Sequence, residues 1–244
     1  MAISRARLDR FLCKFPQFNK HSVRLLLAQQ RVVINDTIET ASDCLIDYFT
    51  KVEVDGVVLQ NNIPHYVMLH KPIGVVCATT DTKHKTVMDL LKYSYKAQLH
   101  IVGRLDLNTS GLVLLTDDSR WSERLTQPES KVEKRYIVTL ANAIYEDYAQ
   151  AFEQGMYFPY EDITTKPAKF TKLSTYQAEV CLVEGRYHQI KRMFGRFRNP
   201  VVALHRHSIG SLALDEQLTV GQSRELTASE VKTIFDLSAI NCCT

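Results

Sequence analysis

The segment GRLDLNTSG, residues 103–111, places the carboxylate of Asp106 close to the guanidinium of Arg104 in a polar loop. Apolar runs at His100–Val102 and Leu112–Leu115 precede and follow this loop, and short apolar runs bounded by glycine are typical of buried strands. We therefore expect core strands to hold both ends of the loop, with Asp106 on a rigid support. An ionised carboxylate on such a support can act as a nucleophile or stabilise a developing positive charge.

The same loop could be an ordinary turn, because Asp, Asn, Thr and Ser side chains commonly satisfy neighbouring backbone groups. Three other segments favour the chemical interpretation. They are KPIG at Lys71–Gly74, EKRY at Glu133–Tyr136 and EGRYHQIKRMF at Glu184–Phe194. The first of them follows an apolar run, Tyr66–Leu69, which predicts another buried strand.

Together with GRLDLNTSGLVLLTDD at Gly103–Asp118, these segments resemble the family of rRNA pseudouridine synthases that contains RsuA, RluB, RluE and RluF. The resemblance covers nearly the whole chain, and the blocks Gly103–Asp118 and Glu184–Phe194 are its most specific parts. Lys166–Ala168, the Glu184–Phe194 block and the short C-terminus most resemble the RsuA branch, which acts on 16S rRNA.

The reaction of this family breaks the glycosidic N–C bond of a uridine, turns the detached uracil, and rejoins it to the ribose through carbon. It needs no redox change and no group transferred from a cofactor. The resemblance implies that Asp106 is the nucleophile, that Tyr136 stacks on the target base and assists proton removal, and that Lys191 is the basic partner of the carboxylate. On its own, Tyr136 could equally be a strand residue that fills the core.

A flipped nucleotide needs a pocket, since chemistry on a base inside structured RNA requires extrusion of that base at a cost of a few kcal/mol. Arg104 has the geometry to enter the space that the flipped nucleotide leaves, and Ile190 and Met193 are expected to form an apolar wall. Lys191 and Arg192 point in different directions on a helix, so the sequence leaves open which of them faces Asp106. The pocket prediction therefore comprises Arg104, Ile190, Met193 and Arg192.

The net charge of +3 hides two strongly basic segments. Residues 1–31 carry seven Lys or Arg against one acid, whereas residues 32–59 carry one Lys against six acids. Residues 185–207 carry six Lys or Arg and no acid, interleaved with Tyr187, Phe194 and Phe197. A charged segment is often only a solvated surface, but cations next to aromatic rings suit phosphate contacts beside base stacking. Nucleic acid is therefore the leading partner.

The first sixty residues have their own order of elements. Apolar residues within Arg7–Phe15 follow helical spacing, Ser22 can cap a second helix to about Gln30, and Asp55-Gly56 between β-rich runs predicts a hairpin. Two short helices followed by small strands resemble the S4 RNA-binding domain. Gln30 and Asp36 stand where that family has glycines, although Asp tolerates positive φ. The residues expected to contact RNA, here and in the second basic segment, are Arg7, Lys20, Ser22, Arg24, Arg31, Arg186, Arg196 and Arg198.

The order of predicted elements indicates an α+β protein. We expect an S4-like module at 1–60, a linker at 61–65, a catalytic domain at 66–236 with a mixed or antiparallel sheet flanked by helices, and a tail at 237–244. Strands are predicted at Tyr66–Ala78, Arg135–Leu140, Gln177–Val183 and Val201–Leu204, and helices at Val87–Leu91, Ser119–Leu125, Glu146–Gln154 and Tyr187–Phe194. Thr227 and Glu230 predict a capping box that opens a final helix.

Composition excludes several classes of protein. No apolar stretch approaches the ~18 residues of a transmembrane helix, and the N-terminus lacks the apolar core of a secretory signal, so we expect a soluble, cytoplasmic monomer without a membrane partner. Six cysteines form no CxxC pair and are interpreted as reduced thiols, and eight histidines show no ligand spacing. No metal and no cofactor are expected.

These observations favour an rRNA pseudouridine synthase that acts on 16S rRNA, possessing an S4-like module that docks the RNA. A 23S rRNA substrate is the alternative within the family. A non-catalytic RNA-binding or ribosome-assembly protein is the alternative from another class. A metal-dependent nuclease is disfavoured, because the sequence lacks the clustered carboxylates that two-metal chemistry would use.

Overall fold

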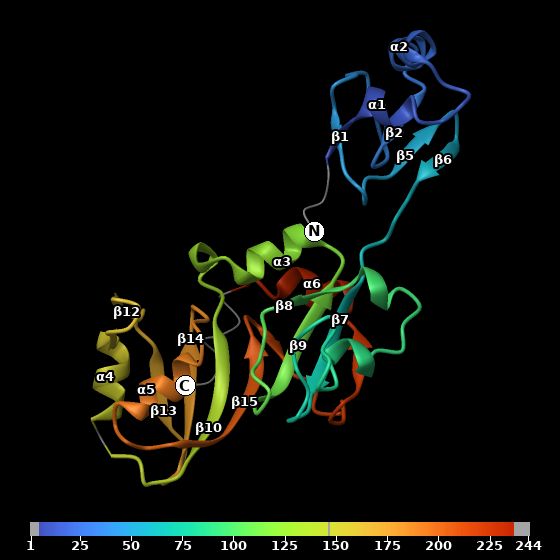
Figure 1. Cartoon of the computed structure of the whole chain (residues 1–244). Coiled ribbons are helices and arrows are strands. Elements are labelled where there is room, and N and C mark those ends of the chain that lie inside the picture. Colours follow the sequence, from blue (N-terminus) through green and yellow to red (C-terminus); the bar gives the residue numbers. More distant parts are fainter. Residues whose placement is uncertain (1–4, 146, 237–244) are drawn as a thin grey trace. The chain divides into compact units, whose positions relative to one another are not determined.

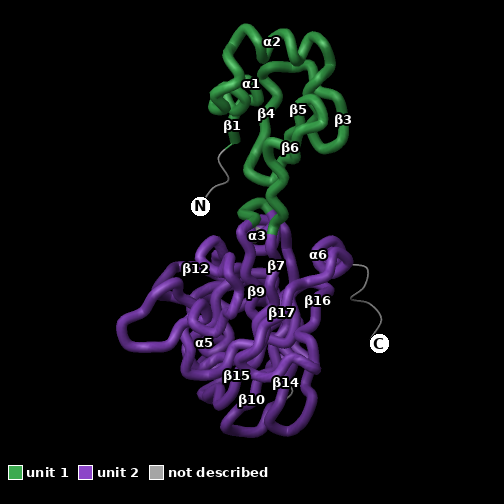
Figure 2. Tube along the Cα trace, turned by 90° about the vertical axis from the view of Figure 1, so that its right-hand side faces the viewer, with its two compact units in different colours: residues 1–64, 118–120 green, residues 65–117, 121–244 purple. Residues whose placement is uncertain are grey.

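The computed structural model describes residues 5–145 and 147–236, and its chain divides into two compact units (Figures 1 and 2). Unit 1 comprises residues 1–64 and 118–120, and unit 2 comprises residues 65–117 and 121–244. The predicted tail 237–244, with Cys242 and Cys243, lies outside the described residues.

Unit 1 contains two short helices above small antiparallel sheets. The helices are α1 (Leu8–Leu12) and α2 (Lys20–Ala28), and the strands are β1 (Ala6–Arg7), β2 (Val32–Ile34), β3 (Thr37–Ile38), β4 (Leu45–Ile46), β5 (Val52–Val54) and β6 (Val57–Gln60). One sheet has the order β3-β2-β5-β6, and β1 pairs with β4. Buried side chains from both helices, among them Leu8, Leu12 and Leu27, pack on Val32 and Val52 of the larger sheet.

The turns of unit 1 use residues that tolerate left-handed backbone conformations. Asp55 (φ 52°) and Gly56 (φ 79°) form the predicted hairpin turn between β5 and β6. Asp36 also has positive φ, at 66°. The prediction that Ser22 opens α2 is wrong: Asn19 is the N-cap, and Ser22 is the third residue of the helix, where its hydroxyl accepts from the Asn19 backbone N–H at 2.8 Å. Asn outranks Ser only slightly as a cap, so the sequence offered two nearly equal starts.

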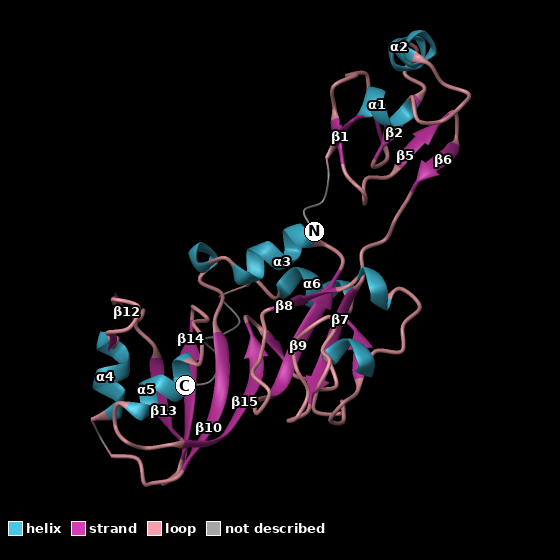
Figure 3. Cartoon of the chain, in the orientation of Figure 1, coloured by secondary structure: helices cyan, strands magenta, loops and turns pink. Residues whose placement is uncertain are grey.

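Unit 2 combines a large sheet with short helices (Figure 3). Its strands are β7 (Tyr66–Lys71), β8 (His100–Val102), β9 (Ser110–Thr116), β10 (Lys134–Leu140), β11 (Tyr157–Phe158), β12 (Ile163–Thr164), β13 (Lys169–Lys172), β14 (Gln177–Leu182), β15 (Val201–Ile209), β16 (Leu212–Ala213) and β17 (Ser223–Glu225). Its helices are α3 (Ser119–Thr126, of which residues 119–120 are grouped with unit 1), α4 (Tyr148–Gln154), α5 (Gln189–Gly195) and α6 (Ala228–Thr233). There are also 3₁₀ turns at Val87–Leu90, Lys96–Gln98 and Pro128–Ser130.

Within the described part of unit 2, nine strands form one mixed sheet of order β13-β14-β10-β15-β9-β7-β17, with β16 beside β15 and β8 beside β9. All pairs are antiparallel except β15 and β9, which run parallel over a short contact at His205↔Ser110 and Arg206↔Gly111. The predicted α+β class with a mixed sheet is confirmed. The parallel contact joins the two halves of the sheet at the loop that precedes β9.

The sheet of unit 2 is buried on both faces near its centre. Strand β9 alternates its side chains, so that Val113 and Leu115 enter one apolar cluster while Leu112 and Leu114 enter the other. Helices α4 and α5 cover the first cluster over β13 and β14, as Figure 1 shows, and α3 and α6 contribute to the second. Burial on both faces explains why SGLVLLT is a nearly continuous apolar run rather than an alternating one.

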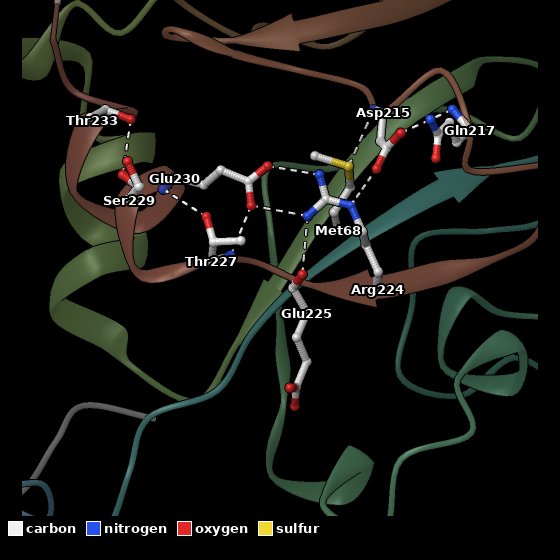
Figure 4. Close-up of polar contacts among 9 residues, drawn as sticks. All are labelled: Met68, Asp215, Gln217, Arg224, Glu225, Thr227, Ser229, Glu230 and Thr233. Carbon is white, nitrogen blue, oxygen red and sulfur yellow. Dashed lines mark hydrogen bonds and ion pairs between the residues drawn. The ribbon is translucent and has the colours of Figure 1, made fainter.

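A partly buried ion network ties β17 to α6 (Figure 4). The guanidinium of Arg224 donates to Glu230 through both terminal nitrogens, at 2.7 and 3.0 Å, and its Nε donates to Asp215 at 2.6 Å. The predicted capping box of Thr227 and Glu230 is confirmed at the start of α6. Glu230 therefore serves both the helix cap and the ion pair.

Several predicted boundaries differ from the structure. The strand expected at Tyr66–Ala78 ends at Lys71, because Pro72 removes a backbone donor and the chain turns at Gly74 (φ 82°). Strand β15 extends five residues beyond its predicted end, through the basic stretch that contains Arg206. The helix expected from Tyr187 begins at Gln189. No helix in residues 5–145 or 147–236 has the length and apolar character needed to span a membrane.

Candidate active site

Asp106 lies in a loop whose backbone is bound by a buried lysine. Lys71, the last residue of β7, is fully buried. Its Nζ donates to the carbonyl oxygens of Thr109 at 2.7 Å, of Asp106 at 3.0 Å and of Pro72 at 3.0 Å. Burial lowers the pKa of the Lys71 amine, because the ammonium form loses its hydration. The KPIG segment therefore fixes the Asp106 loop to the end of a core strand.

A second buried cation holds the two ends of the same loop. Arg206 of β15 is 1 % exposed, and it donates from Nε to the carbonyl of Leu112 at 2.8 Å and from Nη2 to that of Gly103 at 2.9 Å. Gly111 makes this possible, since a Cβ there would lie 2.2 Å from the Arg206 carbonyl oxygen. The glycine is thus required for the close approach of β9 to β15.

The side chain of Asp106 faces two basic groups from the α5 region. The ammonium of Lys191 lies 3.0 Å from Asp106 Oδ2, and Nε2 of His188 lies 3.4 Å from the same oxygen. All three side chains are about one-third exposed, so the group is open to a ligand while remaining partly shielded from water. Lys191, and not Arg192, is therefore the cation that faces Asp106.

A hydrogen-bonded turn places the basic groups next to the carboxylate. Glu184 is buried, and its two oxygens accept from Gln189 Nε2 at 2.7 Å and from Arg186 Nε at 3.1 Å. Gln189 Oε1 in turn accepts from the Arg186 backbone N–H at 3.1 Å. Within this turn His188 adopts a left-handed conformation, with φ 49°. The EGRYHQ segment therefore forms a rigid turn that directs His188 and the start of α5 toward Asp106.

A pocket of about 90 Å³ opens beside this carboxylate. Its apolar wall comes from the sheet and from α5, through Tyr136, Leu182, Leu204 and Ile190. Tyr136 is 8 % exposed and also contacts the core cluster, so it fills the core and lines the pocket at once. The polar residues that line the pocket are Arg104, Asp106, Thr109, Arg186, His188, Gln189 and Lys191. The arrangement suits a planar, partly polar ligand next to a carboxylate.

Two residues predicted for the pocket lie elsewhere. Arg192 pairs with Glu161 and stacks on the ring of Phe158, so it does not line the pocket. Met193 is fully buried in the core and has no pocket surface. Arg196 and Arg198, which were predicted to contact RNA outside the pocket, are exposed beyond the end of α5. Helix periodicity explains the first two, because adjacent residues must point to different sides.

Three residues that contribute most to the site were not predicted for it. Lys71 and Arg206 act through backbone carbonyls, and a sequence pattern does not indicate such contacts. His188 was part of the EGRYHQIK block, but its left-handed conformation turns its ring toward Asp106. The signal for Lys71 was present in the KPIG segment, since a lysine at the end of an apolar strand is rarely buried without backbone partners.

The basic residues of unit 1 form a cleft of their own. Arg7, Arg10, Lys20 and Arg24 line it, together with Asp9 and Ser42. Arg10, Lys20 and Arg24 are exposed, and none of the three has an acidic partner among the described residues. Three members of the predicted set are engaged by protein groups: Arg7 forms an ion pair with Asp9 at 2.8 Å, Ser22 bonds the Asn19 backbone, and Arg31 forms an ion pair with Asp55 at 2.6 Å. Arg10, which was not among the residues predicted to contact RNA, also lines this cleft.

Metal ligands are not gathered anywhere in the described residues: no group of three or more His, Cys, Asp or Glu side chains there could hold an ion. The carboxylate of Asp106 instead has a lysine and a histidine as its neighbours. The chemistry available at this site is therefore that of a carboxylate, an ammonium and an aromatic pocket.

Comparisons with known proteins agree with this geometry. Residues 65–195 match the family described as RNA pseudouridylate synthase. The chain is 42% identical to the ribosomal small subunit pseudouridine synthase A of Pseudomonas aeruginosa over 229 residues, covering 93% of this chain and 100% of the relative. It is 39% identical to the protein of the same name from Vibrio cholerae, covering 94% of this chain and 99% of the relative.

One solved structure extends the likeness to the fold of the whole chain. A crystal structure of a pseudouridylate synthase superposes with a TM-score of 0.68 at 39% identity, covering 93% of this chain and 99% of the other. The family match, at residues 65–195, includes both the loop around Asp106 and the turn around His188.

Proposed function

The chain belongs to the RNA pseudouridylate synthase family, and from this premise we propose that it isomerises a uridine of small-subunit ribosomal RNA to pseudouridine. The family prediction made from the sequence is thus confirmed. The relatives that are 38–42% identical to this chain carry the name ribosomal small subunit pseudouridine synthase A. That name, shared by relatives that match nearly the whole chain, supports a 16S rRNA substrate over a 23S one.

The observation that carries the proposal is the ion pair of Asp106 and Lys191 at the rim of an aromatic pocket. In the proposed reaction the target uridine leaves the RNA helix and its uracil enters the pocket against Tyr136. The carboxylate of Asp106 acts at the ribose or the base, so that the bond from C1′ to N1 breaks. The uracil turns, its C5 bonds to C1′, and the proton on C5 leaves while N1 gains one from solvent.

Each protein group has a distinct part in this scheme. Lys191 keeps the carboxylate oriented and balances its charge in a partly dry site. Lys71 and Arg206 hold the loop in place before RNA binds, so that binding does not have to order Asp106. Tyr136 offers a ring against which the uracil can rotate, and Arg104, which is exposed at the rim, can fill the space that the flipped nucleotide leaves.

RNA recognition beyond the pocket is assigned to the cationic surfaces. We infer that unit 1 works as an S4-like module, with the unpaired cations Arg10, Lys20 and Arg24 binding phosphates in the cleft. Arg186, which lies at the pocket, and the exposed Arg196 and Arg198 extend the cationic surface of unit 2. The cytoplasmic location, the monomeric state and the independence from cofactors remain predictions from the sequence.

The test is to map pseudouridines in small-subunit rRNA after incubation with the purified protein. We expect one new pseudouridine, formed by the wild type and not by an Asp106→Asn variant. Modification of large-subunit rRNA instead would reassign the substrate within the family. RNA binding without any pseudouridine would favour a non-catalytic RNA-binding or ribosome-assembly protein.

A further inference from the structure

Asp106 borders a second hollow, whose lining does not include Tyr136. This groove is lined by Val76, Cys77 and Ala78 on one wall and by Arg186, Tyr187 and His188 on the other. Its volume is about 440 Å³, against about 90 Å³ for the pocket. Arg104, Asp106 and His188 line both hollows, whereas Tyr136 lines only the pocket and Tyr187 only the groove. The uracil pocket therefore continues into a larger space that one base does not fill.

An aromatic pair forms one wall of this groove. The rings of Tyr187 and His188 stack with centroids 3.9 Å apart and an angle of 20° between their planes. His188 Nε2 contacts Asp106, which fixes the inner ring of the stack. Tyr187 is the outer ring and is 74 % exposed, and its hydroxyl has no hydrogen bond to any described residue. A tyrosine that packs on so little protein contributes little to stability.

The charges along the groove suit RNA backbone. Arg104 and Arg186 are both exposed and line it, although Arg186 Nε also pairs with the buried Glu184 at 3.1 Å, and no acidic side chain other than Asp106 is among the lining residues. The opposite wall is neutral: the backbone N–H of Leu105 donates to Cys77 Sγ at 3.3 Å, and burial raises the pKa of that thiol. An exposed ring next to guanidinium groups is the combination that holds unpaired nucleotides.

We propose that Tyr187, supported by His188, is a stacking platform for the nucleobase next to the target uridine, and that this neighbour occupies the groove when the uracil occupies the pocket. The proposal rests on the proposed function, since it concerns the same RNA. Two hollows that share the carboxylate as their border would hold two consecutive nucleotides, with the reacting ribose between them. Tyr187 then contributes to the selection of the target uridine, because the nucleobase next to that uridine must be able to leave the RNA helix and stack on Tyr187.

The experiment is a double-mutant cycle between the protein and the RNA. The RNA is a small-subunit rRNA fragment in which the wild type forms pseudouridine, and the nucleotide on each side of that uridine is replaced in turn by an abasic one. Dissociation constants are measured for Tyr187→Ala and Tyr187→Phe in an Asp106→Asn background, which prevents turnover. Tyr160→Ala is the matched control, because Tyr160 is 97 % exposed and lines neither hollow.

For one of the two flanking positions, we expect the abasic RNA to bind about tenfold more weakly than the intact RNA, as for loss of one stacked base. Tyr187→Ala should weaken binding of the intact RNA by a similar factor. The dissociation constant of this variant should be the same for the intact RNA and for the RNA that is abasic at that position. Tyr187→Phe and Tyr160→Ala should behave as the parent. The affinity losses caused by Tyr187→Ala and by the abasic nucleotide could instead be additive at both flanking positions, or Tyr187→Phe could lose as much affinity as Tyr187→Ala. Either result would overturn the proposal that Tyr187 is a stacking platform. Absence of pseudouridine with the wild type would instead overturn the proposed function itself.

Discussion

Lys191 and Asp106 are 85 residues apart in the sequence, yet the ammonium of one lies 3.0 Å from the carboxylate of the other. The two side chains come from separate supports, a loop fixed by buried cations and the first turn of α5. Neither support depends on the ion pair for its own structure. The pair therefore belongs to the site and not to the scaffold, and each member can be replaced without loss of the fold.

Replacement of Lys191 by alanine should lower kcat/KM by about 100-fold, because a positioned cation in a partly dry site is lost. The stability of the protein should change little, since Lys191 is 30% exposed. Arg192→Ala is the matched control, as it removes the next cation along the helix, which pairs with Glu161. A loss in the Arg192 variant equal to that in the Lys191 variant would mean that total charge, and not contact with Asp106, matters.

Lys71→Met should destabilise the protein by about 2 kcal/mol, because the three carbonyls that Lys71 binds at 3.0 Å or less lose their donor at a cost of roughly 1 kcal/mol each, partly offset by removal of a buried charge. Catalytic activity should fall by a larger factor than the fraction of folded protein, because the Asp106 loop loses its hydrogen bonds to Lys71. Denaturant unfolding and single-turnover kinetics measure the two effects. Lys92→Met, at an exposed lysine, should change neither.

The sequence predicted the parts of this site that depend on strand and loop order. Gly103–Gly111 between two apolar runs indicated a supported carboxylate, and Asp106 lies in such a loop. What could not be predicted are contacts that depend on register. Arg206 reaches the loop because β15 runs parallel to β9 at one point, and the basic stretch around it gave only the signal of a charged surface. His188 depends on a backbone conformation that non-glycine residues rarely adopt.

In the fold, too, elements with a local sequence signal were predicted and elements that depend on strand pairing were not. The apolar run Leu112–Leu115 predicted β9 within two residues at each end, and the capping box predicted the start of α6. Strand β17, a charged three-residue edge strand, carries no apolar pattern and was missed. The choice between Lys191 and Arg192 also needed the structure, since helix phase alone does not say which side meets the sheet.

The cationic cleft of unit 1 leads to a salt-dependence prediction. A variant with Arg10, Lys20 and Arg24 all replaced by alanine should lower the slope of log K against log salt by about 2 to 3, since each phosphate contact contributes ~0.7 to 0.9. Arg31→Ala should leave the slope unchanged, because Asp55 already pairs with that guanidinium. If both variants bind RNA with the wild-type slope, unit 1 makes no phosphate contacts through this cleft.

The network of Figure 4 predicts a loss of stability in acid. The Arg224 guanidinium lowers the pKa of the Glu230 carboxyl to about 2, from an ordinary value of 4.5. Because the folded-state pKa is depressed, the stabilisation is complete above pH 4.5 and is lost as pH falls from there toward 2. It should amount to about 1 kcal/mol, since the pair is only partly buried.

Glu230→Gln isolates this effect, because glutamine preserves the capping box with Thr227 while removing the charge. Unfolding by denaturant at pH 7 and pH 3 gives the comparison. The variant should be less stable than the wild type at pH 7, and the difference should shrink at pH 3. A difference that is constant with pH would show that the ion pair contributes nothing.

The central claim is that Asp106 carries the chemistry, and the most direct measurement is release of the hydrogen from uracil carbon 5 by Asp106→Asn. The amide keeps the shape of the side chain and loses the charge, so RNA affinity should stay within several-fold of the wild type. We expect hydrogen release below about one per cent of the wild-type rate at equal RNA occupancy. Release well above that level, with pseudouridine found in the product, would contradict the assignment of Asp106.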